Sequence, residues 1–218
     1  MTDIEIHEAV ALLQEAVKKW QSPAVTIVSQ REGDPFKVLI SCILSLRTQD
    51  KTTAAASERL FALASTPTIM AGLSREEIEK AIYPVGFYRN KAAQILALCR
   101  ELIDKYSGQV PNEIEELMKF KGVGRKTANL VVTLGFGKPG ICVDTHVHRI
   151  CNRWGYVSTK NPEGTEFALR AKLPGEYWLI INDLLVTFGQ NLCHPLSPRC
   201  SICPLFKMCD RVGVKKSR

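Results

Sequence analysis

The sequence predicts an all-α protein, and three observations support that fold class. Apolar residues recur with helical spacing along most of the chain. Short stretches rich in Gly, Pro, Ser or Asn separate the periodic segments. The one strand-like segment, residues 24–28, has no evident partner strand. We therefore expect helices packed on helices.

The clearest helix is expected over residues 87–106. Its apolar side chains fall on one stripe, with charged residues opposite. The other helices are expected over residues 7–20, 36–46, 51–64, 74–82, 113–119, 125–135, 145–154, 163–172 and 176–188. The sequence Gly-Lys-Pro-Gly at residues 137–140 is the best candidate for a crossing between two domains.

The composition is that of an ordinary soluble protein with a basic surface. The 218 residues are 45% hydrophobic and 23% charged, with a net charge of +7 and a pI of about 9.0. The basic excess favours a polyanionic partner, although many proteins are this basic without one. No apolar run reaches the roughly 20 residues of a membrane helix, and the first residues lack a signal-peptide pattern. We expect a cytoplasmic protein without membrane contact.

The eight cysteines fall into two groups. In a reducing compartment they are unlikely to form four disulfides. Four lie in apolar stretches and are expected to be small buried residues: Cys42, Cys99, Cys142 and Cys151. The other four form a C-x6-C-x2-C-x5-C pattern that indicates a metal centre: Cys193, Cys200, Cys203 and Cys209. A single Cys-x-x-Cys pair favours an iron–sulfur cluster, but the spacing leaves zinc open.

Residues 119–129, KFKGVGRKTAN, predict a tight turn between two helices. The turn is Gly122-Val123-Gly124, and the second helix begins near Arg125. Glycine permits close approach of another molecule, and a helix start offers free N–H groups to a phosphate. Lys119, Lys121 and Arg125 add positive charge around this seat. A plain turn between packed helices is the alternative. A P-loop is excluded, because Arg125 separates glycine from lysine.

Lys126 and Asp144 are the candidate catalytic residues. Lys126 lies in the first helical turn, where the helix dipole and partial burial disfavour the ammonium form and favour a nucleophilic amine. Asp144 precedes another helix in the stretch CVDTHVHRICNRW, where it could act as an N-cap or lie beside Lys126. A phosphate contact is the alternative role for Lys126.

Together, KGVGRKTAN, VDTH and the cysteine pattern resemble the endonuclease III family of base-excision DNA glycosylases. The similarity extends over nearly the whole chain and includes PFKVLISCILSLRTQD and VGFYRNKA. It implies a six-helix domain with a helix–hairpin–helix over residues 28–138. A cluster domain would be built from residues 1–27 and 139–218, with DNA bound in the cleft between the two. It also implies a [4Fe–4S] cluster on the four clustered cysteines, and we expect a monomer.

The resemblance further implies an activity. Relatives that act by water alone lack a lysine at the Lys126 position, so Lys126 indicates an enzyme that also cleaves the strand. The implied substrates are double-stranded DNA with oxidised pyrimidines, such as thymine glycol, and abasic sites. Two other classes remain open, namely a non-catalytic DNA-binding module with a structural metal and a redox protein that uses its cluster.

Further DNA-binding candidates follow from the same resemblance. Phe87 stands where a leucine commonly wedges into the duplex, although ordinary packing would also explain it. Arg47 stands where glutamine is usual in the loop that faces the orphaned base. Either Arg47 reads that base, or it grips a phosphate while Gln49 reads. Arg199 in the cysteine loop is expected to face a phosphate, and Gly122, Val123, Gly124, Arg125 and Lys121 would form the hairpin seat.

Overall fold

The computed structural model describes all residues except 21–22, 24 and 27–32. Its described residues contain helices and turns and no strand, as the sequence predicts. The chain divides into two compact units, Met1–Pro23 with Pro139–Arg218, and Ala24–Lys138. The predicted boundary at residues 27 and 28 lies outside the described residues. So does most of the strand-like segment 24–28, of which Val25 and Thr26 are described and helical.

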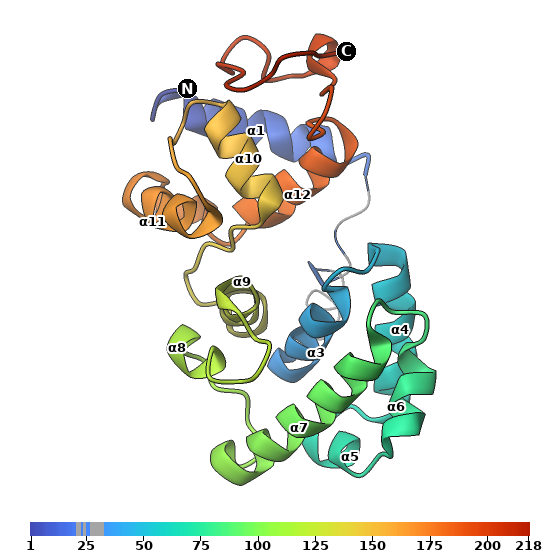
Figure 1. Cartoon of the computed structure of the whole chain (residues 1–218). Coiled ribbons are helices and arrows are strands. Elements are labelled where there is room, and N and C mark those ends of the chain that lie inside the picture. Colours follow the sequence, from blue (N-terminus) through green and yellow to red (C-terminus); the bar gives the residue numbers. More distant parts are fainter. Residues whose placement is uncertain (21–22, 24, 27–32) are drawn as a thin grey trace. The chain divides into compact units, whose positions relative to one another are not determined.

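The unit Ala24–Lys138 is built around α3 (Pro35–Ser45) (Figure 1). Asp34 caps this helix by accepting from the Phe36 N–H at 2.8 Å, and Pro35 occupies its first position. Eight of its eleven residues are buried, including Ser41 and Cys42. A helix that is apolar nearly all round must be enclosed by its neighbours. It packs against α4 (Asp50–Leu63), α7 (Tyr88–Tyr106) and α9 (Arg125–Leu130).

Three shorter α-helices complete the part of this unit that the structure describes. They are α5 (Pro67–Ala71), α6 (Arg75–Ile82) and α8 (Ile114–Leu117). Helix α5 was not predicted, because five residues are too few to show periodicity. Its start is nevertheless marked by the Thr66 cap and by Pro67. Ser74 and Glu77 form a reciprocal capping box at the start of α6.

The predicted helix over residues 125–135 changes its hydrogen-bond pattern part-way. After α9 the chain forms a π-helical turn, η1 (Val131–Gly135). The Thr133 hydroxyl donates to the Asn129 carbonyl at 2.8 Å and to the Leu130 carbonyl at 3.2 Å. Such bonds compete with the backbone ladder and favour a local change of winding. At Gly135, a Cβ would meet the Pro35 backbone at 2.9 Å, so this glycine allows η1 to pack on α3.

The unit Met1–Pro23 with Pro139–Arg218 joins the two ends of the chain. Its helices are α1 (Glu5–Val17), α10 (Thr145–Arg153), α11 (Pro162–Lys172) and α12 (Ile181–Asn191), with the short turns η2 (Gly175–Tyr177) and η3 (Cys200–Ile202). Helix α12 packs against both α1 and α10. The single helix expected over residues 176–188 is wrong, because η2 ends at Tyr177 and α12 begins only at Ile181. None of the described helices has the length and apolar character needed to cross a membrane.

Candidate functional site

The turn between α8 and α9 contains two glycines with different roles. Gly122 has a positive φ and a close neighbour, whereas Gly124 has free space beside it. Gly122 has a φ of +80°, and a Cβ there would meet Gln94 Nε2 at 2.5 Å. Gln94 instead donates to the Lys121 carbonyl at 2.9 Å, which fixes the turn on α7. Gly124 is the N-cap of α9, and a Cβ added there would meet no atom within 4 Å. This side of the turn is therefore open to an approaching group.

The hairpin residues differ in what they can offer a ligand. The Val123 side chain is buried, and its N–H donates to the Phe120 carbonyl at 3.0 Å. Val123 therefore supports the turn from inside. Lys121 is exposed, whereas Arg125 is half-buried at the start of α9. A basic, open helix start is the arrangement that binds phosphate.

Lys126 lies on the first turn of α9 and is exposed, so the partial burial expected for it is wrong for the free chain. Below it, α3 places the thiol of Cys42 within reach of its charge. Burial raises the pKa of Cys42 to about 12, and the positive charge of Lys126 opposes that rise. The Lys126 side chain is thus in contact with solvent, and its charge is close enough to α3 to act on Cys42. Desolvation of Lys126 would have to come from a ligand that covers it.

Asp144 belongs to the other unit, where it caps α10. Its Oδ1 accepts from the His146 N–H at 2.8 Å and from the Val147 N–H at 2.9 Å. The side chain is buried, and the two N–H donors fix its orientation. The predicted N-cap is confirmed. Its predicted place beside Lys126 stays a prediction.

The loops before α4 and before α7 bring Arg47, Gln49 and Phe87 to one region of the unit Ala24–Lys138. Arg47 and Phe87 are exposed and have φ values of +54° and +58°, in the left-handed region that bulky residues rarely adopt. The Arg47 guanidinium lies 5.7 Å from the centre of the Phe87 ring, which is within cation–π range. Gln49 is exposed at the N-cap of α4.

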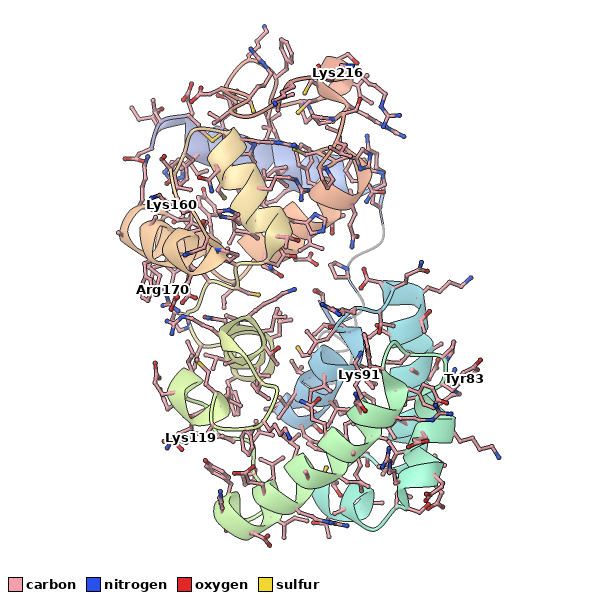
Figure 2. The ribbon with its side chains drawn as sticks, viewed as in Figure 1. Tyr83, Lys91, Lys119, Lys160, Arg170 and Lys216 are labelled. Carbon is pink, nitrogen blue, oxygen red and sulfur yellow. The ribbon has the colours of Figure 1, made fainter. Side chains whose placement is uncertain are left out.

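Lys91 was missed by the sequence analysis, which placed charged residues opposite the apolar stripe of α7. Lys91, which is labelled in Figure 2, is only 5% exposed. Its ammonium donates to the Leu44 and Leu46 carbonyls at 2.8 and 2.6 Å. The signal was present in the sequence, because Lys91 is in helical register with Ile95, Leu98 and Leu102. Burial lowers the pKa of Lys91 to about 8.

The four clustered cysteines lie in the C-terminal loop, each half-buried. Burial raises the pKa of Cys203 to about 11, and the charges of the other three thiols act in the same direction. These four sulfur atoms are therefore close enough to influence one another. Among the described residues, no three His, Cys, Asp or Glu side chains are arranged to hold a single metal ion. Arg199 is exposed at the start of η3.

Arg153 anchors this loop and was also missed. It is buried on α10, and its guanidinium donates to the His194 and Pro195 carbonyls, each at 2.6 Å. It also lies 3.4 Å from the Cys193 sulfur as a donor. A buried guanidinium beside the Cys193 sulfur supplies positive charge that would compensate a thiolate. The donor set and its surroundings thus fit a metal centre that takes four cysteine ligands.

The comparisons with known proteins agree with these features. Residues 40–174 match the family described as HhH-GPD superfamily base excision DNA repair protein. Endonuclease III of Thermotoga maritima is 48% identical over 182 residues, covering 84% of this chain and 85% of that protein. Endonuclease III of Escherichia coli is 36% identical over 178 residues, covering 82% and 84%. This chain belongs to the endonuclease III family.

Two solved structures support the same assignment. The structure titled "Structure of a non-covalent Endonuclease III-DNA Complex" has a TM-score of 0.84 and 36% identity, covering 97% of this chain and 96% of that one. The structure titled "Structure of a Trapped Endonuclease III-DNA Covalent Intermediate: Estranged-Adenine Complex" has a TM-score of 0.82 and 35% identity, covering 97% of both chains. The all-α endonuclease III fold is therefore shared over nearly the whole chain.

The cap at Asp144 yields a stability prediction for this endonuclease III family member. Asp144→Ala removes the acceptor for two N–H groups and should lower the free energy of unfolding by about 1 kcal/mol. Asp144→Asn keeps an acceptor oxygen and should cost only a few tenths of that figure. Chemical denaturation followed by circular dichroism measures both. Equal, large losses for the two variants would show that the charge, not the cap, holds α10.

Proposed function

We propose that this chain is a bifunctional DNA glycosylase and AP lyase of base excision repair, with Lys126 as its nucleophile. The observation that carries the proposal is an exposed lysine on the first turn of the helix that follows an open, basic glycine turn. Family membership supports the activity, and the related structure with a trapped covalent intermediate supports a nucleophilic route.

Lys126 would act through its neutral amine. The amine attacks C1′ of the damaged nucleoside, the C1′–N bond breaks, and the base leaves with its bonding electron pair and takes up a proton. The C1′–amine adduct loses a proton from nitrogen, and the C1′–O4′ bond of the sugar then opens as O4′ takes up a proton, which gives a protonated Schiff base. This Schiff base makes a C2′ proton acidic. Loss of that proton expels the 3′ phosphate by β-elimination, and water later releases the lysine. No external oxidant or reductant is required.

Asp144 would supply negative charge to the same reaction. Its carboxylate is buried and held by two N–H donors, so its orientation is fixed without a need to reorganise. A preorganised charge of this kind stabilises the positive charge that grows on the sugar as the base leaves. This role is compatible with capping, because Oδ1 accepts both backbone bonds.

The substrate would be double-stranded DNA that contains an oxidised pyrimidine or an abasic site. The hairpin with Gly122, Gly124, Lys121 and Arg125 would hold phosphates, as would Arg199 in the other unit. The damaged nucleotide must leave the stack, which costs a few kcal/mol and is easiest for a poorly paired lesion. Arg47, Gln49 and Phe87 are exposed on neighbouring loops and would occupy the space that the flipped nucleotide leaves.

The four clustered cysteines would hold a [4Fe–4S] cluster. Such a cluster, when bound, supplies a covalent cross-link for a loop that has little apolar content of its own. The residues of this chain prepare the site, because Arg153 fixes the Cys193 segment and adds positive charge beside it. The proposed role of the centre is structural.

One prediction of the proposed function tests Lys126 as the nucleophile. Lys126→Gln should abolish base excision and strand cleavage while leaving affinity for a duplex with an uncleavable abasic analogue nearly unchanged. Borohydride reduction during incubation with an abasic duplex should trap wild-type protein covalently and should not trap this variant. Lys121→Gln is the matched control, since it removes a lysine from the same turn and should weaken binding but still be trapped.

Absence of trapping in the wild type would favour a non-catalytic DNA-binding module. Trapping of Lys126→Gln would assign the nucleophile elsewhere.

Asp144→Asn, which keeps the cap, should lower the single-turnover rate of excision by roughly 100-fold or more, as expected when a preorganised electrostatic group is lost.

A second prediction concerns the metal. Protein purified without air should contain about four irons and four sulfides per chain, as a cluster with four cysteine ligands requires. Elemental analysis and the visible absorption spectrum measure this. Cys203→Ala should lose the iron, whereas Cys99→Ala, in the core of the other unit, should retain it. Stoichiometric zinc in place of iron would overturn the assignment.

A third prediction concerns the orphaned base. Arginine offers only donors, which match guanine O6 and N7 but meet a donor at adenine N6. A bidentate pair discriminates by about 1–3 kcal/mol, so excision should be faster opposite guanine than opposite adenine. Arg47→Gln should lower this ratio of single-turnover rates. Equal losses opposite both bases, with a shallower salt dependence, would indicate a phosphate contact instead.

A further inference from the structure

A buried ammonium joins the loop before α4 to the start of α7. Lys91 Nζ donates to the Leu44 carbonyl at 2.8 Å, to the Leu46 carbonyl at 2.6 Å and to the Thr48 hydroxyl at 3.2 Å. An ammonium has three protons, so these three acceptors use its full donor capacity. Burial of a charged ammonium costs free energy unless hydrogen bonds compensate it. The three bonds of Lys91 provide that compensation and tie α7 to the loop before α4.

The same hydroxyl makes a second link. Thr48 Oγ1 also accepts from the Gly86 N–H at 3.1 Å, so one side chain bridges the two loops. At Gly86 the loops approach so closely that a Cβ would meet the Arg47 carbonyl oxygen at 2.5 Å. That atom belongs to the backbone and cannot rotate away. Glycine at position 86 is therefore a condition for the contact.

The residues next to these links are the two exposed tips. Arg47 is flanked by two Lys91 acceptors, and Phe87 follows Gly86. Both tips have left-handed backbones, which persist in bulky residues only where the surroundings impose them. The linked loops place the guanidinium of one tip over the ring of the other. Arg59 braces the second loop from α4, because its guanidinium donates to the Ala81 and Tyr83 carbonyls at 2.8 and 2.6 Å.

We propose that Lys91 is a positioning residue that, with Thr48 and Gly86, holds Arg47 and Phe87 together as one preformed probe of the opposite strand. The proposal rests on the proposed function, since it assigns a mechanical basis to the reading of the orphaned base. Lys91 touches neither DNA nor the reacting atoms. Its ammonium acts by fixing the distance between two loops whose tips enter the duplex.

The test uses two variants that break the link in different ways. Lys91→Met keeps the length of the side chain and removes all three donors. Gly86→Ala leaves Lys91 in place and pushes the loops apart through the backbone contact. Lys105→Met is the matched control, because Lys105 lies on the same helix, is exposed and pairs with Glu101 one turn away. Thermal unfolding identifies any variant that is not folded at the assay temperature.

Two ratios are measured for the full-length protein. One is the single-turnover rate with a lesion opposite guanine divided by that opposite adenine. The other is the duplex excision rate divided by the rate of borohydride trapping on a single-stranded abasic oligonucleotide, which needs Lys126 but no probe. Both loop variants should lower the second ratio by roughly 10- to 100-fold, as a misplaced group does, and should bring the first towards one. The Lys105 variant should match wild type.

Each result decides between a positioning and a merely structural role. Unchanged ratios in folded Gly86→Ala would overturn the proposal even if Lys91→Met were unfolded. Parallel losses on duplex and single-stranded substrates would also overturn it, since these indicate general damage. If wild type is trapped but shows no guanine preference, the Arg47 assignment fails and the duplex ratio still tests the link. If wild type is not trapped at all, the proposed function itself fails.

Discussion

The buried carboxyl end of α3 is the constraint on which the unit Ala24–Lys138 depends. The last carbonyls of a helix have no partner within the helix, and unpaired carbonyls cannot be buried cheaply. Here Lys91 donates to the carbonyls of Leu44 and Leu46, and its positive charge lies at the negative end of the helix dipole. A cation from α7 thus satisfies carbonyls at the end of an almost wholly apolar helix. The arrangement also fixes where the chain emerges, at Arg47.

The position of α3 explains why Lys126 and the residues proposed to read the orphaned base share one unit. Because α3 is buried on nearly all sides, α4, α7 and α9 must pack around it. The start of α9 carries Lys126 near Cys42, and the loop with Arg47 leaves the same end of α3, after Ser45. The residues proposed to react and those proposed to read are therefore set by contacts with the same helix. Substitutions in its core should disturb both together, because interiors are packed closely enough to transmit strain.

Much of this arrangement could be predicted from the sequence, since it depends on local signals. Periodicity and breakers located nearly every helix, and the Gly122 turn and the Asp144 cap follow from residue type. The exceptions have local causes too. Helix α5 is too short to show a period, and the expected helix over residues 176–188 divides where η2 gives way to α12. Side-chain bonds from Thr133 convert the end of a predicted α-helix into a π-helical turn.

The links between distant segments could not be predicted in this way. Lys91 is in register with buried leucines, which indicates burial, but its acceptors lie more than 40 residues away in sequence. Arg153 likewise meets carbonyls of the cysteine loop that only the tertiary fold brings to it. The exposed position of Lys126 was also missed, because a helix start indicates the dipole field and not the solvent. Lys91 and Arg153 are thus each placed by partners that no local pattern identifies.

The pairing of Arg47 with Phe87 bears on what such long-range order would contribute to the proposed reading of the orphaned base. A free arginine side chain loses rotamer entropy when it docks, and that loss weakens binding. Over the Phe87 ring, the guanidinium has part of its freedom removed before DNA arrives. The left-handed backbone at both residues needs support, and the Lys91 and Thr48 bonds supply it. Hydrogen bonds inside the unit thus offset the backbone strain at Arg47 and Phe87. If the proposed probe is ordered before binding, its loops do not rearrange to suit a mismatched base. The difference in binding between guanine and adenine then depends on the hydrogen bonds that Arg47 makes with each.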